Sequence, residues 1–173
     1  MVEALLSVDV RPPSSLASLR VRPALPGERG LIRSFVARFH STLPSSPAVW
    51  VTAFVLEDLA SNVWGVGIWS HPTARLEDQR FTFELSRYAL GPGLPPNAAS
   101  WALARMRAFI RRFYPHVTRL ITYSDDTVHS GSIYRADNWR LVYSGRREYS
   151  PWSSRPGRTA VTCVLRSKWE RVP

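Results

Sequence analysis

Two stretches of the chain repeat apolar residues at the three-and-four spacing of an amphipathic helix. In residues 28–40 the repeating side chains are Leu31, Ile32, Phe35, Val36 and Phe39. In residues 97–113 they are Ala99, Ala102, Leu103, Met106, Phe109, Ile110 and Phe113. Asn97 is suited to an N-cap, and Pro115 ends the second pattern. The spacing predicts two long helices, of which 97–113 is the clearer.

Strands are predicted where apolar, β-branched and aromatic residues alternate or cluster. The predicted strands are residues 19–22, 49–56, 63–69, 81–90, 117–123, 139–149 and 159–165. The second and third should form a hairpin, a short helix is expected at 130–137, and Gly145 is a candidate β-bulge. The order β-α-β-β-β-α-β-α-β-β predicts an α/β (α+β) fold, in which helices cover both faces of a mixed, mostly antiparallel sheet.

The chain has 173 residues, which favours one domain with a substantial core. Residues 1–17, rich in Pro and Ser, are predicted to be a poorly ordered lead-in to a single domain spanning 18–173. No apolar run approaches the length of a membrane span, and no signal-peptide pattern is present. Cys163 is the single cysteine and lies in a mostly apolar run. We therefore expect a cytoplasmic protein without membrane association.

The formal net charge is +10, and Lys168 is the single lysine among 23 basic residues. Arginine contacts phosphate in bidentate fashion and stacks on bases, so nucleic acid is a candidate partner. A GC-rich genome would explain the preference for Arg over Lys, although not the excess of positive charge. Four arginines around Trp152 form a candidate nucleic-acid-binding loop, whose alternative is a solvated basic loop. These are Arg146, Arg147, Arg155 and Arg158.

The start of the 97–113 helix is a candidate phosphate site. Free N–H groups and the positive end of the dipole favour an anion there, and Asn97 and Ser100 could each add a side-chain bond. The candidate cofactor-binding residues are Asn97, Ala98, Ala99 and Ser100, with Tyr88 near the end of the preceding strand. The alternative is an ordinary capped helix.

Tyr134, on the predicted short helix, could serve as a general acid for a leaving thiolate; alternatively it is a core aromatic. Asp125, Asp126 and His129 form the densest polar cluster at a strand end. One of them could act as a general base or bind a metal, with His40 joining from elsewhere. The alternative is a turn cluster stabilised by local hydrogen bonds.

Glu84 and Arg87 fall in the predicted strand 81–90 among apolar neighbours. A charge in a central strand is costly unless it is paired. Two explanations remain open: an internal ion pair or edge exposure, and an arginine that faces an anionic ligand.

Between Phe81 and Gly145 the chain resembles the GNAT-like acyltransferases, and specifically the phage Mom-type DNA-modification proteins. The matching pieces are residues 84–87 (ELSR), 96–101 (PNAASW), 122–125 (TYSD), 129–134 (HSGSIY) and 138–139 (NW). Common GNAT enzymes have a Gln/Arg-x-x-Gly-x-Gly/Ala loop before the long helix, whereas residues 94–100 here are LPPNAAS. Mom-type proteins share that departure.

The resemblance implies a GNAT-like fold and use of acetyl-CoA or another acyl-CoA, with its pyrophosphate at residues 97–100. It implies that Tyr134 is the general acid and that Ser124, Asp125 and Arg87 line the reaction centre. Bound iron has been linked to the family, and His40, Asp125 and His129 are the ligands this chain offers.

We therefore predict an acyltransferase that modifies a DNA base, with the adenine N6 amine as the leading candidate, in phage or host DNA to resist restriction. One alternative is a GNAT-type N-acetyltransferase acting on a small amine or a protein, and another is a non-enzymatic nucleic-acid-binding module. DNA and acyl-CoA are the expected partners, and a homodimer is one expected assembly.

Overall fold

A computed structural model describes residues 11–146 and 165–173. The strands are β1 Leu19–Pro23, β2 Thr52–Asp58, β3 Val63–Ser70, β4 Thr82–Leu90, β5 Arg119–Asp125, β6 Arg140–Arg146 and β7 Leu165–Arg171. The α-helices are α1 Arg29–Phe39, α2 Ala98–Phe113 and α3 Ser132–Ala136, and two 3-10 helices are Leu16–Ser18 and Pro26–Glu28. The expected element order is confirmed.

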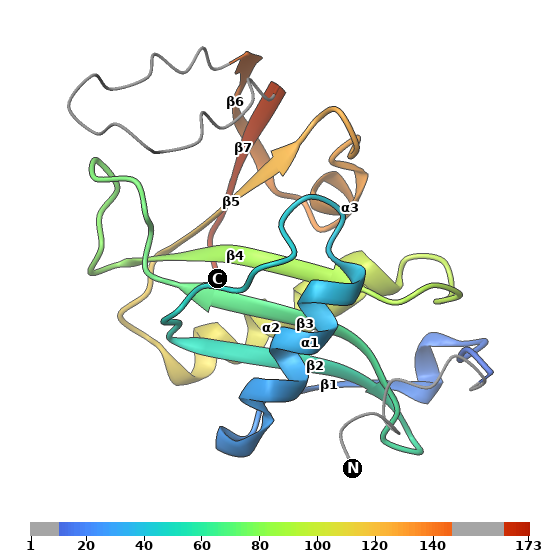
Figure 1. Ribbon diagram of the computed structural model, residues 1–173. Helices are drawn as coiled ribbons and strands as arrows, with labels where there is room; N and C mark the ends of the chain where they lie inside the picture. Colours follow the sequence, from blue (N-terminus) through green and yellow to red (C-terminus); the bar gives the residue numbers. More distant parts are fainter. Residues whose placement is uncertain (1–10, 147–164) are drawn as a thin grey trace, which may run out of the picture.

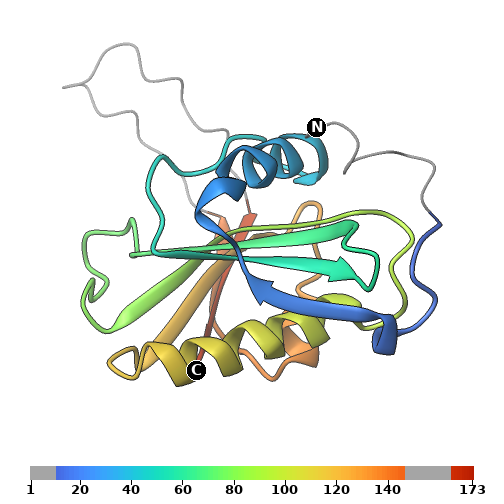
Figure 2. The same cartoon turned by 90° about the horizontal axis from the view of Figure 1, so that it is seen from below.

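The seven strands form one sheet in the order β1-β2-β3-β4-β5-β7-β6 (Figure 1). Each neighbouring pair is antiparallel except β4 and β5, which are parallel. The long helices α1 and α2 lie on opposite faces of this sheet (Figure 2). The predicted mixed sheet, covered on both faces, is therefore confirmed, as is the β2–β3 hairpin.

Two apolar clusters fill the two faces. The cluster under α1 includes Phe35, Val36 and Ile68. The larger cluster under α2 includes Leu103, Met106 and several aromatic side chains. Because paired residues on neighbouring strands share a face, membership of these clusters shows which face each strand residue occupies.

The parallel pair β4–β5 is short, and the sheet opens beyond it. Thr82 to Leu85 pair with Arg119 to Thr122, and no further residues of the two strands are paired. In Figure 1 the strands start side by side and then diverge, with β5 accompanied by β7 and β6. The second half of β4 and the second half of β5 are therefore not hydrogen-bonded to each other.

The structure corrects two details of the sequence prediction. The last strand is described from Leu165 to Arg171, and residues 159–164 of the predicted strand lie outside the described residues. The register of β6 shifts between Leu141 and Tyr143, so the irregularity does not lie at Gly145. Part of the N-terminal lead-in, Leu16–Ser18, is a 3-10 helix. Residues 1–10 and Cys163 lie outside the described residues.

A buried ion pair attaches α3 to α2. Arg107 donates from Nε and Nη2 to the two carboxylate oxygens of Asp137, at 2.7 Å each. The indole N–H of Trp139 donates to the same carboxylate. Gly131 precedes α3 with φ +70°, and a Cβ there would lie 2.3 Å from the ring of Trp169. These contacts fix the position of Tyr134, which lies between Gly131 and Asp137.

Replacing Asp137 with alanine should lower the free energy of unfolding by about 3 kcal/mol, since it leaves the guanidinium of Arg107 buried and unpaired. Urea denaturation would measure the change. The control is Asp78→Ala, which removes an exposed carboxylate that accepts two backbone N–H bonds and should cost about 1 kcal/mol. Equal losses in the two variants would contradict the structural role of the Arg107 pair.

Candidate functional site

A cleft of about 2260 Å³ follows the opening between β4 and β5. Its floor is made of the diverging halves of the two strands, and its walls come from segments 40–51, 71–79 and 128–134. Because the opening interrupts the sheet, residues from both faces reach this one cleft. The face under α2 contributes tyrosines, and the face under α1 contributes charged and imidazole side chains.

A β-bulge in β4 directs these side chains. Ile68 of β3 pairs with Arg87, whereas Trp69 pairs with Leu85, so Ser86 is an extra residue in β4. The Ser86 hydroxyl lies 2.9 Å from the Ser70 hydroxyl and 3.1 Å from the Ile68 carbonyl oxygen. Arg87 therefore shares the α1 face with Ile68. The bulge turns β4 where it parts from β5.

Tyr134 lies on the α2 side of the opening and lines the cleft. Its ring packs against Trp139 and Trp169, with centroid distances of 5.8 and 5.5 Å. Its phenol is close to the hydroxyl of Thr122, the last β5 residue paired with β4. Burial raises the pKa of Tyr134 above its ordinary value of 10. The phenol is therefore protonated at neutral pH and can donate a proton at the apex of the opening.

Tyr88 is a second tyrosine on the same face. Its hydroxyl donates to the carbonyl of Ala99 in the first turn of α2, at 2.7 Å. Burial raises the pKa of Tyr88 well above 10, with the proximity of Tyr134 and Asp137 acting in the same direction. Tyr88 thus joins the cleft to the start of α2.

The helix start itself lies outside the lining of the cleft. Tyr88 is a lining residue, but Asn97, Ala98, Ala99 and Ser100 are not. Asn97 is exposed with φ +65° and makes no side-chain capping bond, which corrects the expected N-cap interaction. The Ala98 N–H donates to the Pro95 carbonyl, so one first-turn N–H group is already used. The structure thus brings the predicted cofactor residues near the cleft, but not into it.

Ser124 and Asp125 line the cleft, but their polar atoms have protein partners. The Ser124 hydroxyl donates to Asp126 and accepts from the indole of Trp169, each at 3.0 Å. Asp125 accepts from the N–H and the hydroxyl of Thr127. The turn interpretation of this cluster therefore describes the local geometry well, and the reaction-centre roles of Ser124 and Asp125 stay predictions.

Glu84 is a lining residue that sequence analysis left out of the candidate site. It is 7% exposed, pairs with Ser70 on the α1 face and accepts one bond from the Thr73 N–H at 3.1 Å. Burial is the main cause that raises the pKa of Glu84; Glu77 adds to this, and the Thr73 bond and the charge of Arg87 oppose it. The signal was present in the sequence as a charge within a central strand, but its burial depended on the tertiary fold.

Arg87, His40 and His129 also line the cleft, and Arg87 is close enough to Glu84 for its charge to act on the Glu84 pKa. Arg87 donates from Nε to the Ser45 carbonyl at 2.7 Å, and so holds segment 40–51 against β4. Burial lowers the pKa of Arg87, opposed by the charge of Glu84. Burial, together with Arg87 and His129, lowers the pKa of His40 to about 4. No ion pair joins Arg87 to Glu84 among the described residues, and Arg87 lines the cleft, so its role toward an anionic ligand stays a prediction.

His40 is neutral at physiological pH, because its pKa is about 4. Only its Nε2 is free of the hydrogen bonds to the backbone of segment 40–51. Its Nδ1 accepts from the N–H groups of Thr42 and Leu43 at 3.3 and 3.2 Å, so the proton resides on Nε2. The Nε2 of His129 is 2.6 Å from the Ser41 hydroxyl. Within residues 11–146 and 165–173, no three His, Cys, Asp or Glu side chains gather as a metal site. The predicted iron ligands His40, Asp125 and His129 are therefore not assembled.

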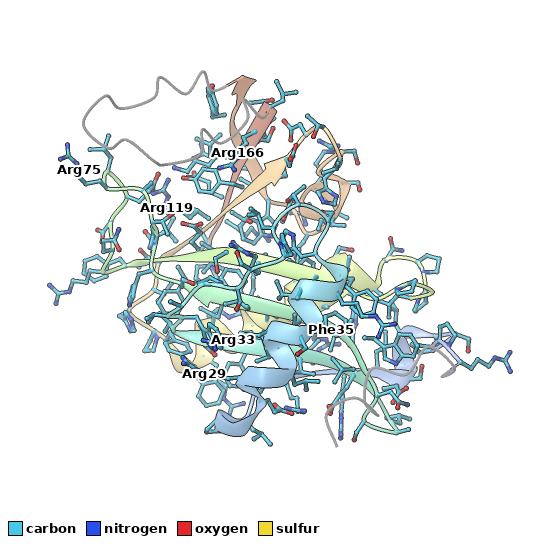
Figure 3. The ribbon with its side chains drawn as sticks, viewed as in Figure 1. Arg29, Arg33, Phe35, Arg75, Arg119 and Arg166 are labelled. Atoms are coloured by element: carbon cyan, nitrogen blue, oxygen red, sulfur yellow. The ribbon has the colours of Figure 1, made fainter. Side chains whose placement is uncertain are left out.

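The outer wall of the cleft carries a network of ion pairs. Glu77 binds Arg119 at 2.7 Å and also contacts Lys168, and Arg119 binds Glu170 at 2.9 Å. Figure 3 shows Arg75 on the β3–β4 loop pointing away from the sheet and Arg166 on β7. Four cations line the cleft, Arg75, Arg87, Arg166 and Lys168, and so do three carboxylates, Glu77, Glu84 and Asp125. Of these carboxylates, Glu77 is paired with both Arg119 and Lys168.

Comparison with known proteins identifies the family. The family model described as the Mom protein family matches residues 61–168, which include β3, β4, α2, β5 and α3. The chain belongs to the Mom protein family. No curated protein matches the chain significantly.

Solved structures show the fold of this Mom-family chain. A spermidine N-acetyltransferase from Vibrio cholerae, in complex with CoA and spermine, is similar with a TM-score of 0.63 and 11% identity, covering 90% of this chain and 96% of that one. A ribosomal-protein-S5-alanine acetyltransferase from Vibrio fischeri is similar with a TM-score of 0.63 and 11% identity, covering 91% of this chain and 94% of that one. An acetyltransferase of the GNAT family from Streptococcus pneumoniae is similar with a TM-score of 0.62 and 12% identity, covering 89% of this chain and 98% of that one. The fold is that of the GNAT acetyltransferases.

Among the described residues, no helix is long and apolar enough to cross a bilayer. Most of the predicted nucleic-acid-binding loop, including Arg147, Trp152, Arg155 and Arg158, lies outside them. The backbone of Arg146 ends β6. That loop stays a prediction.

Proposed function

We propose that this protein transfers an acyl group from acyl-CoA to an amine of a DNA base, with adenine N6 as the leading acceptor. The observation that carries the proposal is the pair of proton-transfer groups on the two sides of the opened sheet. Tyr134 is a protonated phenol on the α2 side, and Glu84 is a buried carboxylate with a raised pKa on the α1 side. Both line one cleft in a chain of the Mom family.

The chemistry needs both groups. The exocyclic amine is a weak nucleophile because its lone pair is delocalised into the ring, so positioning and proton removal matter. Glu84 takes the proton of the amine as the new C–N bond forms at the thioester carbonyl. Tyr134 gives its proton to the thiolate as the C–S bond breaks. The products are the acylated base and CoA, and solvent returns a proton from Glu84 to Tyr134.

Acyl-CoA fits the α2 side of the cleft. Tyr88 connects the floor to the first turn of α2, where Ala99 and Ser100 are half-exposed. We propose that a diphosphate lies over these amides while the thioester extends toward Tyr134. The base enters from the α1 side, past Arg87 and His40, after leaving its stack.

The charge of the cleft supports DNA over a polycationic amine by a small margin. Four cations line it against three carboxylates, and the carboxylate of Glu77 is already paired. The likeness to amine and protein N-acetyltransferases keeps one alternative open, a GNAT-type transferase acting on a small amine or a protein. A second alternative, a nucleic-acid-binding module without enzymatic activity, has no role for the two proton-transfer groups.

Incubation with isotope-labelled acetyl-CoA should place label on adenine nucleosides of DNA. Scintillation counting and mass spectrometry of digested DNA would measure it, in air and with added iron. Label on spermidine or protein but not on DNA would support the transferase alternative. Salt-sensitive DNA binding without a thermal shift from CoA would support the binding module. Either result would overturn the proposal.

A further inference from the structure

The β3–β4 loop, residues 71–81, presents one leucine to solvent at the edge of the cleft. Leu76 is 93% exposed, more than any other large apolar side chain among the described residues. At that exposure the side chain contributes almost nothing to packing within the monomer. Other exposed apolar residues that line the cleft are Leu43, Val128 and Val49, which are 40%, 54% and 78% exposed. Leu76 is thus displayed without a partner in the fold.

The loop that displays Leu76 is firmly anchored on both sides. Glu77, its neighbour, is held by Arg119 and Lys168. Gln79 donates from Nε2 to the Pro72 carbonyl at 2.6 Å. The Thr73 N–H donates to Glu84, and this bond connects the loop directly to the candidate general base. A rigid loop can hold an apolar side chain in water at a fixed distance from the reaction centre.

Basic side chains flank this leucine. Arg75 precedes it and points away from the sheet (Figure 3). Arg80 lies over the ring of Phe81, 5.1 Å from its centroid, at the base of the loop. An apolar tip with adjacent arginines is the arrangement by which proteins contact backbone phosphates while inserting a side chain between bases.

We propose that Leu76 is a wedge that enters the stack of duplex DNA and fills the space left by the target base, while Arg75 contacts a neighbouring phosphate. The inference rests on the proposed function, because a base must leave the helix to reach Glu84 and Tyr134. Extruding a base costs a few kcal/mol of stacking and pairing, and a wedge offsets part of that cost. The partner that we propose is duplex DNA, because a base in a single strand is not paired and can reach the cleft without a wedge.

The test compares Leu76→Ala with wild type on the same DNA, as duplex and after denaturation into single strands. The variant should label duplex about tenfold more slowly, equivalent to about 1.4 kcal/mol of lost stabilisation, and label single strands within about twofold of wild type. Leu76→Phe should retain duplex labelling. The matched control is Leu59→Ala, which removes a 73% exposed leucine in the β2–β3 turn away from the cleft and should change neither rate.

A second measurement does not depend on catalysis. Permanganate oxidises unstacked thymines, so wild-type protein should increase thymine reactivity opposite extruded adenines, and Leu76→Ala should remove the increase. Equal duplex rates for wild type and variant, or equal losses on duplex and single strands, would overturn the wedge. If wild type labels single strands and Leu76→Ala matches it on duplex, the wedge alone fails. If wild type labels neither DNA form, the proposed function fails.

Discussion

Replacing Tyr134 by phenylalanine should lower kcat for acyl transfer about a hundredfold and leave KM for acyl-CoA within about twofold. A general acid contributes on the order of 10² to 10⁴ in rate because it protonates the leaving group as the bond breaks. The phenol can do so because burial raises the pKa of Tyr134 and keeps it protonated at neutral pH. Binding of the carrier does not need the hydroxyl, so the effect falls on kcat.

Phenylalanine keeps the contacts with Trp139 and Trp169, so the variant should fold normally. Steady-state kinetics with a thiol reagent that detects released CoA would measure the change, and thermal unfolding would check the fold. Tyr143→Phe is the matched control, because Tyr143 lines the cleft from β6 and is 50% exposed. A fully active Tyr134→Phe enzyme would remove this residue from the catalytic site.

Replacing Glu84 by glutamine should lower kcat/KM about a hundredfold and abolish the acid limb of the pH profile. The carboxylate form accepts the proton of the amine, so activity must fall as pH drops through the pKa of Glu84. Burial raises that pKa above its ordinary value of 4.5, which moves the limb toward neutral pH. Glutamine keeps the size and can still accept from the Thr73 N–H, but it cannot take a proton.

The profile of kcat/KM from pH 4 to 9 would show this limb in wild type, since kcat/KM reports groups of the free enzyme. Asp125→Asn is the comparison, because its carboxylate is engaged by Thr127 at the turn after β5. We expect that variant to keep the acid limb. An unchanged limb in Glu84→Gln would remove Glu84 from the role of general base. Loss of the limb in Asp125→Asn would assign that role to Asp125, one of the three residues that the sequence offered for it.

The resemblance to the Mom family was carried by short motifs, and the family match confirms it. The motifs pointed to Arg87 and Tyr134, both of which line the cleft. They also pointed to the residues 97–100, which the fold leaves beside the cleft. The predicted iron ligands do not assemble as a metal site among the described residues. Nδ1 of His40 and a carboxylate oxygen of Asp125 already accept backbone N–H bonds.

The order of the elements and their approximate ends could be predicted from local patterns, because helices and strands impose periods of 3.6 and 2 on the positions of apolar residues. Residues near in the chain set those periods, so no knowledge of the fold was needed. The end of the β4–β5 pairing after Leu85 and Thr122 became visible in the folded protein alone. The folded protein also shows that Glu84 is buried with a raised pKa, and that Leu76 stands exposed at the edge of the cleft. These properties depend on strand pairing and burial between distant segments, which local patterns do not encode.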